Sequence, residues 1–358
     1  MIAKEEIKES PSKFEDFLLN PYIIICLVAV FFGAFFFQLL FPKIDEAFIS
    51  EVLRLEILRP ICDPFWLVLY WPTVAIFFLS ITVYFVFANK RGLSLAMLAI
   101  VVIGGLFLGD ALKSFFSIFG LGRPPQDLSN WVPALYGDFL PTTSETGDFP
   151  GQSILVPAAF SVYFYLRKPK PWKAILFPVY VGLMVFARPY VGVNHISANI
   201  AGLIIGIYMG LIVYKYSESI RKSVIFDSKL KKLLVAVGLF GLMFLIYWIQ
   251  RPVFVSRAAQ GVDLDIRMFM MVFGGFLGLA LFEYPKEVSL QFENLKDKGI
   301  FILSILLSYV VLFGLYFGAL MLPDSILWVG IIIGFIDGLW ITLGGPKLVE
   351  YLNQESIE

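Results

Sequence analysis

The sequence predicts an all-α membrane protein, a polytopic bundle of about ten transmembrane helices. Hydrophobic residues make up 59% of the 358 residues and charged residues only 16%, a balance too apolar for a water-soluble chain of this length. The apolar residues also fall into runs that can cross a bilayer, which takes roughly 17 to 25 residues in a helix. The 28 basic residues balance 28 acidic ones, so the net charge does not indicate nucleic acid as a partner.

Ten apolar runs define the predicted spans. They cover residues 22–41, 65–88, 93–109, 154–166, 174–187, 200–214, 233–249, 268–282, 300–322 and 326–343. No small-residue cleavage site follows the first run, so we expect an uncleaved span there rather than a signal peptide.

A charged stretch at 216–232 separates six spans from four. The predicted organisation is a cytoplasmic N-terminal tail over 1–20, a six-helix core over 21–215, a cytoplasmic linker over 216–232, a four-helix C-terminal membrane region over 233–345 and a cytoplasmic tail over 346–358. Of the 28 Lys and Arg residues, 19 fall on the side of the N-terminus, and such an excess marks the cytoplasmic side. We therefore expect a protein of the cell (inner) membrane, with the connections at 110–150 and around Arg188 on the extracytoplasmic face.

Polar residues from three segments are expected to meet on that outer face. They are Lys113 and Arg123 after the third span, Gln152 at the start of the fourth, and Arg188, Asn194 and His195 between the fifth and sixth. A guanidinium offers a planar fork of donors that matches phosphate oxygens, and helix N-termini add oriented N–H groups. The pattern is compatible with an oxyanion site, while an interfacial arginine can also simply extend toward lipid headgroups.

The ordered set resembles the type-2 phosphatidic acid phosphatase superfamily over about residues 60–215. The residues that carry the resemblance are Arg123-Pro124, Glu145-Thr146-Gly147, Phe149-Pro150, Arg188, Tyr190, Gly192, Val193 and Ala201-Gly202. The resemblance implies a phosphatase-like core, a membrane lipid with a phosphorylated headgroup as partner, and phosphate binding by Arg123, Arg188 and Lys113. It implies no cofactor and no metal, and the chain offers no cluster of metal ligands.

The groups that would perform the family's chemistry are replaced. That chemistry uses one imidazole to attack phosphorus and a second to protonate the departing alkoxide, whereas this chain has a single histidine, His195. An ungapped alignment puts Asn194 at the nucleophile position and Ala198 at that of the orienting carboxylate. Gln152 or Ser153 takes the place of the proton donor, and amides and hydroxyls cannot replace either imidazole.

Three functions stay open from the sequence. The first is a phosphate pocket for a lipid (di)phosphate headgroup in which hydrolysis is impaired or lost. The second is an active lipid phosphate or polyprenyl diphosphate phosphatase in which His195, shifted by an inserted loop residue, is the nucleophile and Asn199 orients it. The third is a transporter or assembly partner that acts through the C-terminal spans. Whether the protein is an enzyme, and in which oligomeric state, the sequence leaves undecided.

Two acidic residues lie in or at the edge of apolar runs, Asp110 and Asp337. An ionisable side chain at such a place is costly, so each predicts either a functional group or a hydrogen bond at a helix end or inside the bundle.

Overall fold

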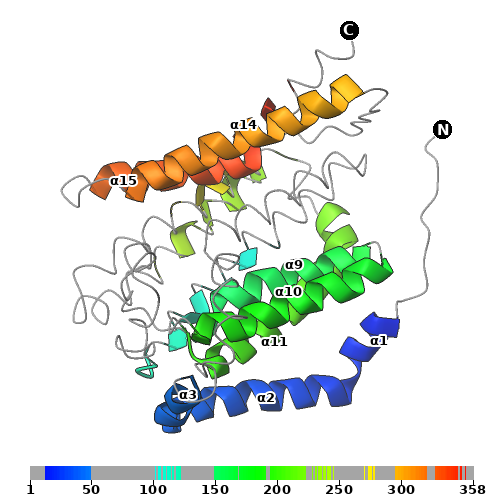
Figure 1. The fold of residues 1–358 in the computed structure, drawn as a ribbon, viewed down its shortest axis with the longest axis vertical. Helices are drawn as coiled ribbons and strands as arrows, with labels where there is room; N and C mark the ends of the chain where they lie inside the picture. The colour runs from blue at the N-terminus through cyan, green and yellow to red at the C-terminus, as the bar shows by residue number, and fades with distance from the viewer. Residues whose placement is uncertain are drawn as a thin grey trace.

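The computed structural model describes residues 13–49, parts of 101–121, 149–222 apart from 168 and 191–193, parts of 228–245 and 270–278, 295–320, and 327–351 with short gaps. In these parts of the chain every regular element is a helix and none is a strand, which confirms the all-α class (Figure 1). The total of ten spans remains a prediction, because the span expected at 65–88 lies outside the described residues.

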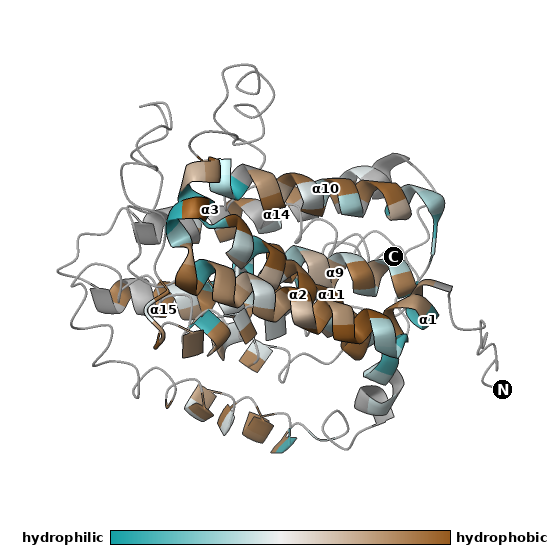
Figure 2. Ribbon diagram, turned by 90° about the horizontal axis from the view of Figure 1, so that it is seen from below, coloured by the Kyte–Doolittle hydropathy of each residue, from teal (hydrophilic) through white to brown (hydrophobic). Residues whose placement is uncertain are grey.

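The first predicted span is helix α2, Pro21–Leu40. Asn20 caps it, since its Oδ1 accepts a hydrogen bond from the backbone N–H of Tyr22 at 2.9 Å, and Pro21 occupies the first helical position, where no N–H is needed. Only 11% of the apolar stretch of α2 is buried inside the protein. The apolar surface that α2 presents (Figure 2) therefore suits contact with lipid.

Within the part of the chain that the structure describes, three helices are long and apolar enough to cross a membrane: α2, α10 (Pro171–Tyr190) and α11 (Ile196–Lys222), the last over Ile196–Ser217. They correspond to the first, fifth and sixth predicted spans. The fourth predicted span is helix α9, Gln152–Arg167, and nearly all of its side chains are buried. The chain thus has the helices of a membrane protein.

Two of these helices run past the predicted ends of their spans. Helix α10 continues from the expected end at 187 to Tyr190, and α11 continues through residues 216–222, where we expected a linker. The apolar pattern marks only the part of a helix that lies in the hydrocarbon layer, whereas polar residues can extend the same helix beyond it. Arg188 consequently belongs to the last turn of α10.

Glycines on α11 allow it to contact α9 at backbone distance. Gly202, Gly206 and Gly210 are spaced four residues apart, which places them on one face of the helix. A Cβ atom at these three positions would collide with the carbonyl oxygens of Gly151, Leu155 and Ala159, respectively. Small residues at helix contacts have this role in membrane proteins. These three glycines, the glycine stripe of α11, hold the first half of α9 in close contact with the first half of α11.

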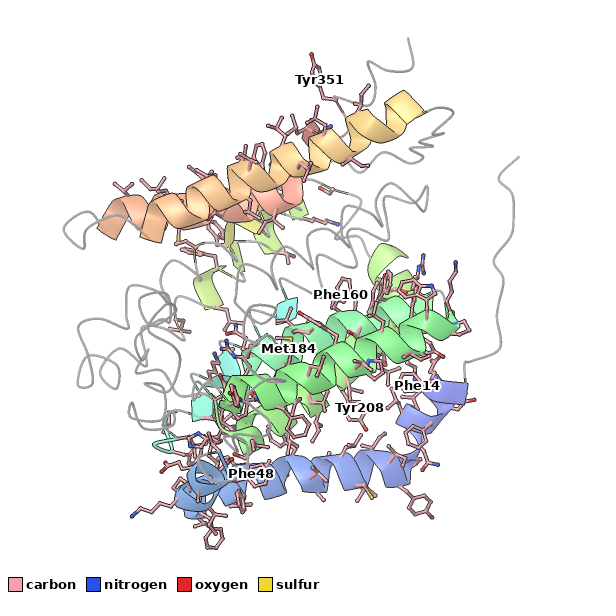
Figure 3. All side chains as sticks on the ribbon, viewed as in Figure 1. Phe14, Phe48, Phe160, Met184, Tyr208 and Tyr351 are labelled. Atoms are coloured by element: carbon pink, nitrogen blue, oxygen red, sulfur yellow. The ribbon has the colours of Figure 1, made fainter. Side chains whose placement is uncertain are left out.

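Helix α2 packs against these helices at both of its ends. Near its start, Leu18 of the short helix α1 (Lys13–Leu19) packs with Val162, Leu166 and Leu211. Near its end, the rings of Phe35, Phe116 and Phe149 form a cluster, with centroids 5.0 Å apart for Phe116 and Phe149. In Figure 3, Phe14 marks the first of these ends, and Phe48, in helix α3 (Pro42–Phe48), marks the second.

The C-terminal region contains helices α14 (Leu295–Leu320) and α15 (Leu327–Leu339), followed by a π-helical turn, Trp340–Gly344. The indole N–H of Trp340 donates to the backbone oxygen of Ser308 at 3.0 Å, which joins the π-helical turn to the middle of α14. These helices coincide with the ninth and tenth predicted spans, and Figure 1 shows them lying along each other.

Candidate functional site

The first turns of α9 and α11 and the last turn of α10 meet at one end of the three helices, which we call the site end. The backbone N–H of Gly151 donates a hydrogen bond to the backbone oxygen of Ala198 in α11 at 2.7 Å. The side-chain Nδ2 of Asn199 donates to the backbone oxygen of Val185 in α10 at 3.0 Å. These two bonds tie the three helix ends together. Helix α3, marked by Phe48 in Figure 3, lies at the same end.

Lys113 and Gln152 are in direct contact at the site end. The Nζ of Lys113 donates to Oε1 of Gln152 at 3.1 Å, and both side chains are largely shielded from solvent. Gly109 makes this possible, because a Cβ atom there would collide with the Gln152 side chain. The structure thus brings together two of the predicted site residues, and it brings a cation to the first turn of α9.

The start of α9 presents the backbone N–H groups of a helix N-terminus. The helix begins at Gln152, and the first N–H groups of any helix have no carbonyl partner within it. Gly151, immediately before, has no room for a side chain, since a Cβ atom would lie 2.6 Å from Oδ1 of Asn199. Helix N-termini of this kind bind anions through their N–H groups and the helix dipole.

Arg188 occupies the last turn of α10 and is half-buried. A cation is favoured at a helix C-terminus by the helix dipole, so Arg188 is stabilised there with or without a ligand. Arg123, the second predicted guanidinium, lies outside the described residues. The pairing of the two arginines therefore stays a prediction.

Three buried side-chain oxygens near these helix ends lack hydrogen bonds: Oγ of Ser153, Oδ1 of Asn194 and Oδ1 of Asn199. Asn194 is 3% exposed, and Ser153 directly follows Gln152. A buried polar group without a partner costs about 1 to 3 kcal/mol, which a bound ligand or an ordered water can recover. The site end thus has spare hydrogen-bonding capacity.

His195 contacts helices α2 and α3. The residue is 2% exposed, with Nδ1 3.1 Å from Nε2 of Gln38. Its Nε2 lies 3.9 Å from Oε1 of Glu46. With the Gln38 amide nitrogen donating, Nδ1 accepts and the ring proton sits on Nε2, on the side of Glu46.

The carboxylate of Asp45 caps α11 from another helix. Its Oδ1 accepts from the backbone N–H of Ile196 and its Oδ2 from that of Ser197, both at 3.1 Å, and the Ser197 hydroxyl adds a bond at 2.5 Å. The same hydroxyl lies 3.3 Å from Oε1 of Gln38. Asp45 is 3% exposed, so an internal carboxylate already fills the anion-binding position at the start of α11.

Gln38, Asp45 and Glu46 were not among the site residues predicted from the sequence. One signal was available: Gln38 is a polar residue inside a long apolar run, and Asp45-Glu46 follows that run directly. The sequence pattern does not indicate that these residues contact the start of α11, because α11 begins far along the chain.

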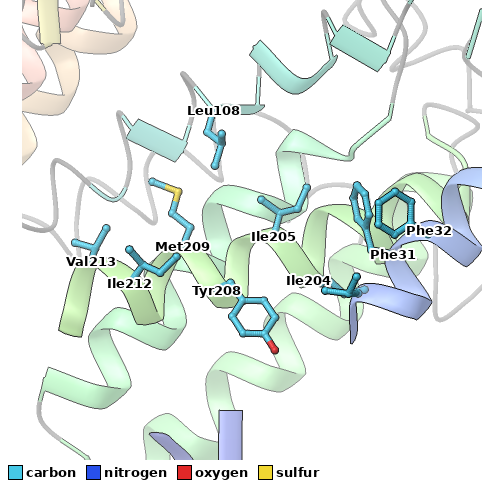
Figure 4. Close-up of a pocket in the computed structure, with 10 residues that line it drawn as sticks. Phe31, Phe32, Leu108, Ile204, Ile205, Tyr208, Met209, Ile212 and Val213 are labelled. Carbon is cyan, nitrogen blue, oxygen red and sulfur yellow. The ribbon is translucent and has the colours of Figure 1, made fainter. Parts of the chain in front are cut away.

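A cavity of about 490 Å³ lies between α2, Leu108 and α11 (Figure 4). Its lining carries no charged residue, and Tyr208 supplies the single polar side chain among the residues that line it. The cavity therefore lacks groups for chemistry or for phosphate binding, and the candidate site is the polar cluster at the site end. Among the described residues, no group of three or more His, Cys, Asp or Glu is placed to hold a metal ion.

Comparison with known proteins gives no relative for this chain. No family model, no curated protein and no solved structure matches it. The resemblance to the phosphatase superfamily consequently rests on the quoted residues alone.

Proposed function

We propose that this chain is an integral membrane protein that binds the phosphate of a lipid (di)phosphate headgroup on its extracytoplasmic side and hydrolyses it poorly or not at all. The observation that carries the proposal is the start of α9. There the Lys113 ammonium lies 3.1 Å from the Gln152 side chain in the first turn of α9, and the buried Ser153 hydroxyl, which has no hydrogen-bond partner, adds a donor. Positive charge and donors at a helix N-terminus are the groups that bind phosphate.

The position of His195 supports the second half of the proposal. An imidazole that attacks phosphorus must reach the phosphate with a free ring nitrogen. Here Nδ1 faces Gln38, Nε2 faces Glu46, and the ring is buried between α11 and the α2–α3 corner. At the positions that resemble the family's catalytic sites stand Asn194 and Gln152, whose amides can hold a phosphate but cannot attack it or protonate a leaving group.

The extracytoplasmic orientation is supported by the distribution of Lys and Arg, which places the site end away from the basic connections. A lipid is the favoured bearer of the phosphate because the helices that form the site also carry the apolar faces of membrane spans.

A binding experiment tests the proposal. Purified protein in detergent is titrated with phosphatidic acid and, as a matched ligand without phosphate, diacylglycerol, and the shift in melting temperature is measured. We expect stabilisation by phosphatidic acid alone. Lys113→Ala should weaken it about tenfold or more, since a charge-assisted hydrogen bond contributes about 1.5 to 3 kcal/mol. Lys43→Ala, which removes an exposed lysine of α3, is the control. Equal stabilisation by both lipids, or an unchanged affinity in Lys113→Ala, contradicts the proposal.

A further inference from the structure

The C-terminal region contains a buried carboxylate that the proposed function does not use. Asp337 lies in α15, in the otherwise apolar segment Leu327–Leu339, and is 3% exposed. Its Oδ1 is buried and has no hydrogen-bond partner. An ionised carboxylate in such surroundings, without a cation or donors, is costly enough that the group takes a proton instead.

The described residues of the elements packed around Asp337 place no cation beside it. A Cβ atom on Gly274 would collide with the backbone oxygen of Phe335 and lie 3.1 Å from the N of Leu339, so the helical segment at 270–278 covers the turn that holds Asp337. The described residues of that segment include no titratable side chain. Lys347, further along the chain, is exposed.

Helix α14 packs on the other side. Its titratable residues are Lys296, Asp297 and Lys298 in the first turn, and Tyr309 and Tyr316 further along. Ser308 contacts Trp340, one turn after Asp337, and the first turn of α14 lies about 15 Å or more from this contact at 1.5 Å per residue. The charged residues of α14 are therefore too far away along the helix to neutralise Asp337.

A second feature marks the same place. Immediately after Asp337 the chain changes from an α-helix to the π-helical turn Trp340–Gly344. Such turns are rare and occur frequently at functional sites, because the change of register frees backbone groups and permits the helix to shift. The buried acid and the register change lie within one turn of each other.

We infer that Asp337 is a proton-binding site of the C-terminal membrane region. The carboxyl group carries a proton in the resting protein, and its O–H bond breaks when the proton passes to water, leaving a carboxylate that later takes a proton back. The ligand is the proton rather than a metal ion, because among the described residues Asp337 belongs to no group of His, Cys, Asp or Glu side chains that could hold a metal ion. This inference is independent of the phosphate site.

Carbodiimide labelling of the full-length protein in lipid vesicles tests the inference, because dicyclohexylcarbodiimide reacts in apolar surroundings with carboxyl groups that carry their proton. At neutral pH we expect label on Asp337, detected by peptide mass, and none on the exposed Asp16. Asp337→Asn should lose the label and still fold, since the amide imitates the neutral acid, whereas Asp16→Asn should keep it. Absence of label on Asp337, or protection of it by sodium ions at constant pH, overturns the inference.

Infrared difference spectra supply a second readout that does not depend on the reagent. Wild type minus Asp337→Asn should contain the C=O band of a protonated carboxyl group, and the band should shift in D₂O as the proton exchanges. A carboxylate band in its place, or a C=O band that does not shift in D₂O, contradicts a proton-exchanging site.

Discussion

Gln38 and His195 are joined by a contact of 3.1 Å between Nε2 and Nδ1, although 157 residues separate them in the chain. Both residues are 2% exposed. The contact makes the only imidazole of the protein part of the interface between α2 and α11, so its first role is to connect these helices.

Removing the Gln38 amide should destabilise the protein. Gln38→Ala leaves the His195 ring and the Ser197 hydroxyl without one of their buried partners, and each loss of this kind costs about 1 to 3 kcal/mol. Thermal unfolding in detergent measures the effect, with Lys43→Ala as the exposed control. A melting temperature equal to that of the control would show that the contact contributes nothing.

Asp45 should be more important still, since its carboxylate satisfies two backbone N–H groups and one hydroxyl at the start of α11. We expect Asp45→Ala to cost about 2 kcal/mol or more, because hydrogen bonds to a charged group are worth about 1.5 to 3 kcal/mol each. Asp45→Asn, which retains one acceptor oxygen, should fall between Asp45→Ala and wild type. The same unfolding assay checks the order, and a loss as large in Asp45→Asn as in Asp45→Ala would argue against the capping role.

Alanine substitutions along the helices should separate contact glycines from the others. Gly206→Ala forces a methyl group against the backbone of Leu155 and should destabilise the α9–α11 pair by about 1 to 3 kcal/mol. Gly182→Ala, in α10, meets nothing within 4 Å and should be neutral or stabilising by up to about 1 kcal/mol, as expected for alanine in a helix. Unfolding midpoints of the two variants compare them directly, and equal midpoints contradict the close packing.

The predicted orientation can be tested with single cysteines in a background where Cys26 and Cys62 are serine. Lys43→Cys, in α3, should react with a membrane-impermeant maleimide added to intact cells, whereas Lys170→Cys, between α9 and α10, should react only after permeabilisation. The reverse pattern would place the site end in the cytoplasm.

The described helices agree with the apolar runs because burial in lipid dictates apolar residues over a fixed length. That length marks the membrane layer and not the helix, so Arg188 and residues 216–222 were expected outside helices that in fact include them. The glycine stripe of α11 could have been recognised from the spacing of Gly202, Gly206 and Gly210 alone.

The candidate site could be predicted only in part. Lys113 and Gln152 were both expected on the outer face, because the count of spans places them there. Their direct contact agrees with that expectation. The contacts of His195 were not, because Gln38 and Glu46 come from the far end of the core and a single sequence does not indicate which distant polar residues meet. Arg123 lies outside the described residues, so its place in the site is still a prediction.

The central claim is that the site end binds a lipid phosphate without a catalytic imidazole. Phosphate release from phosphatidic acid and from a polyprenyl diphosphate by the purified protein tests it most directly, with His195→Gln as the matched variant, since glutamine keeps a polar group beside Gln38. The account predicts no release above background from either protein, under conditions in which phosphatidic acid still raises the melting temperature. Robust release by wild type that disappears in His195→Gln would contradict it.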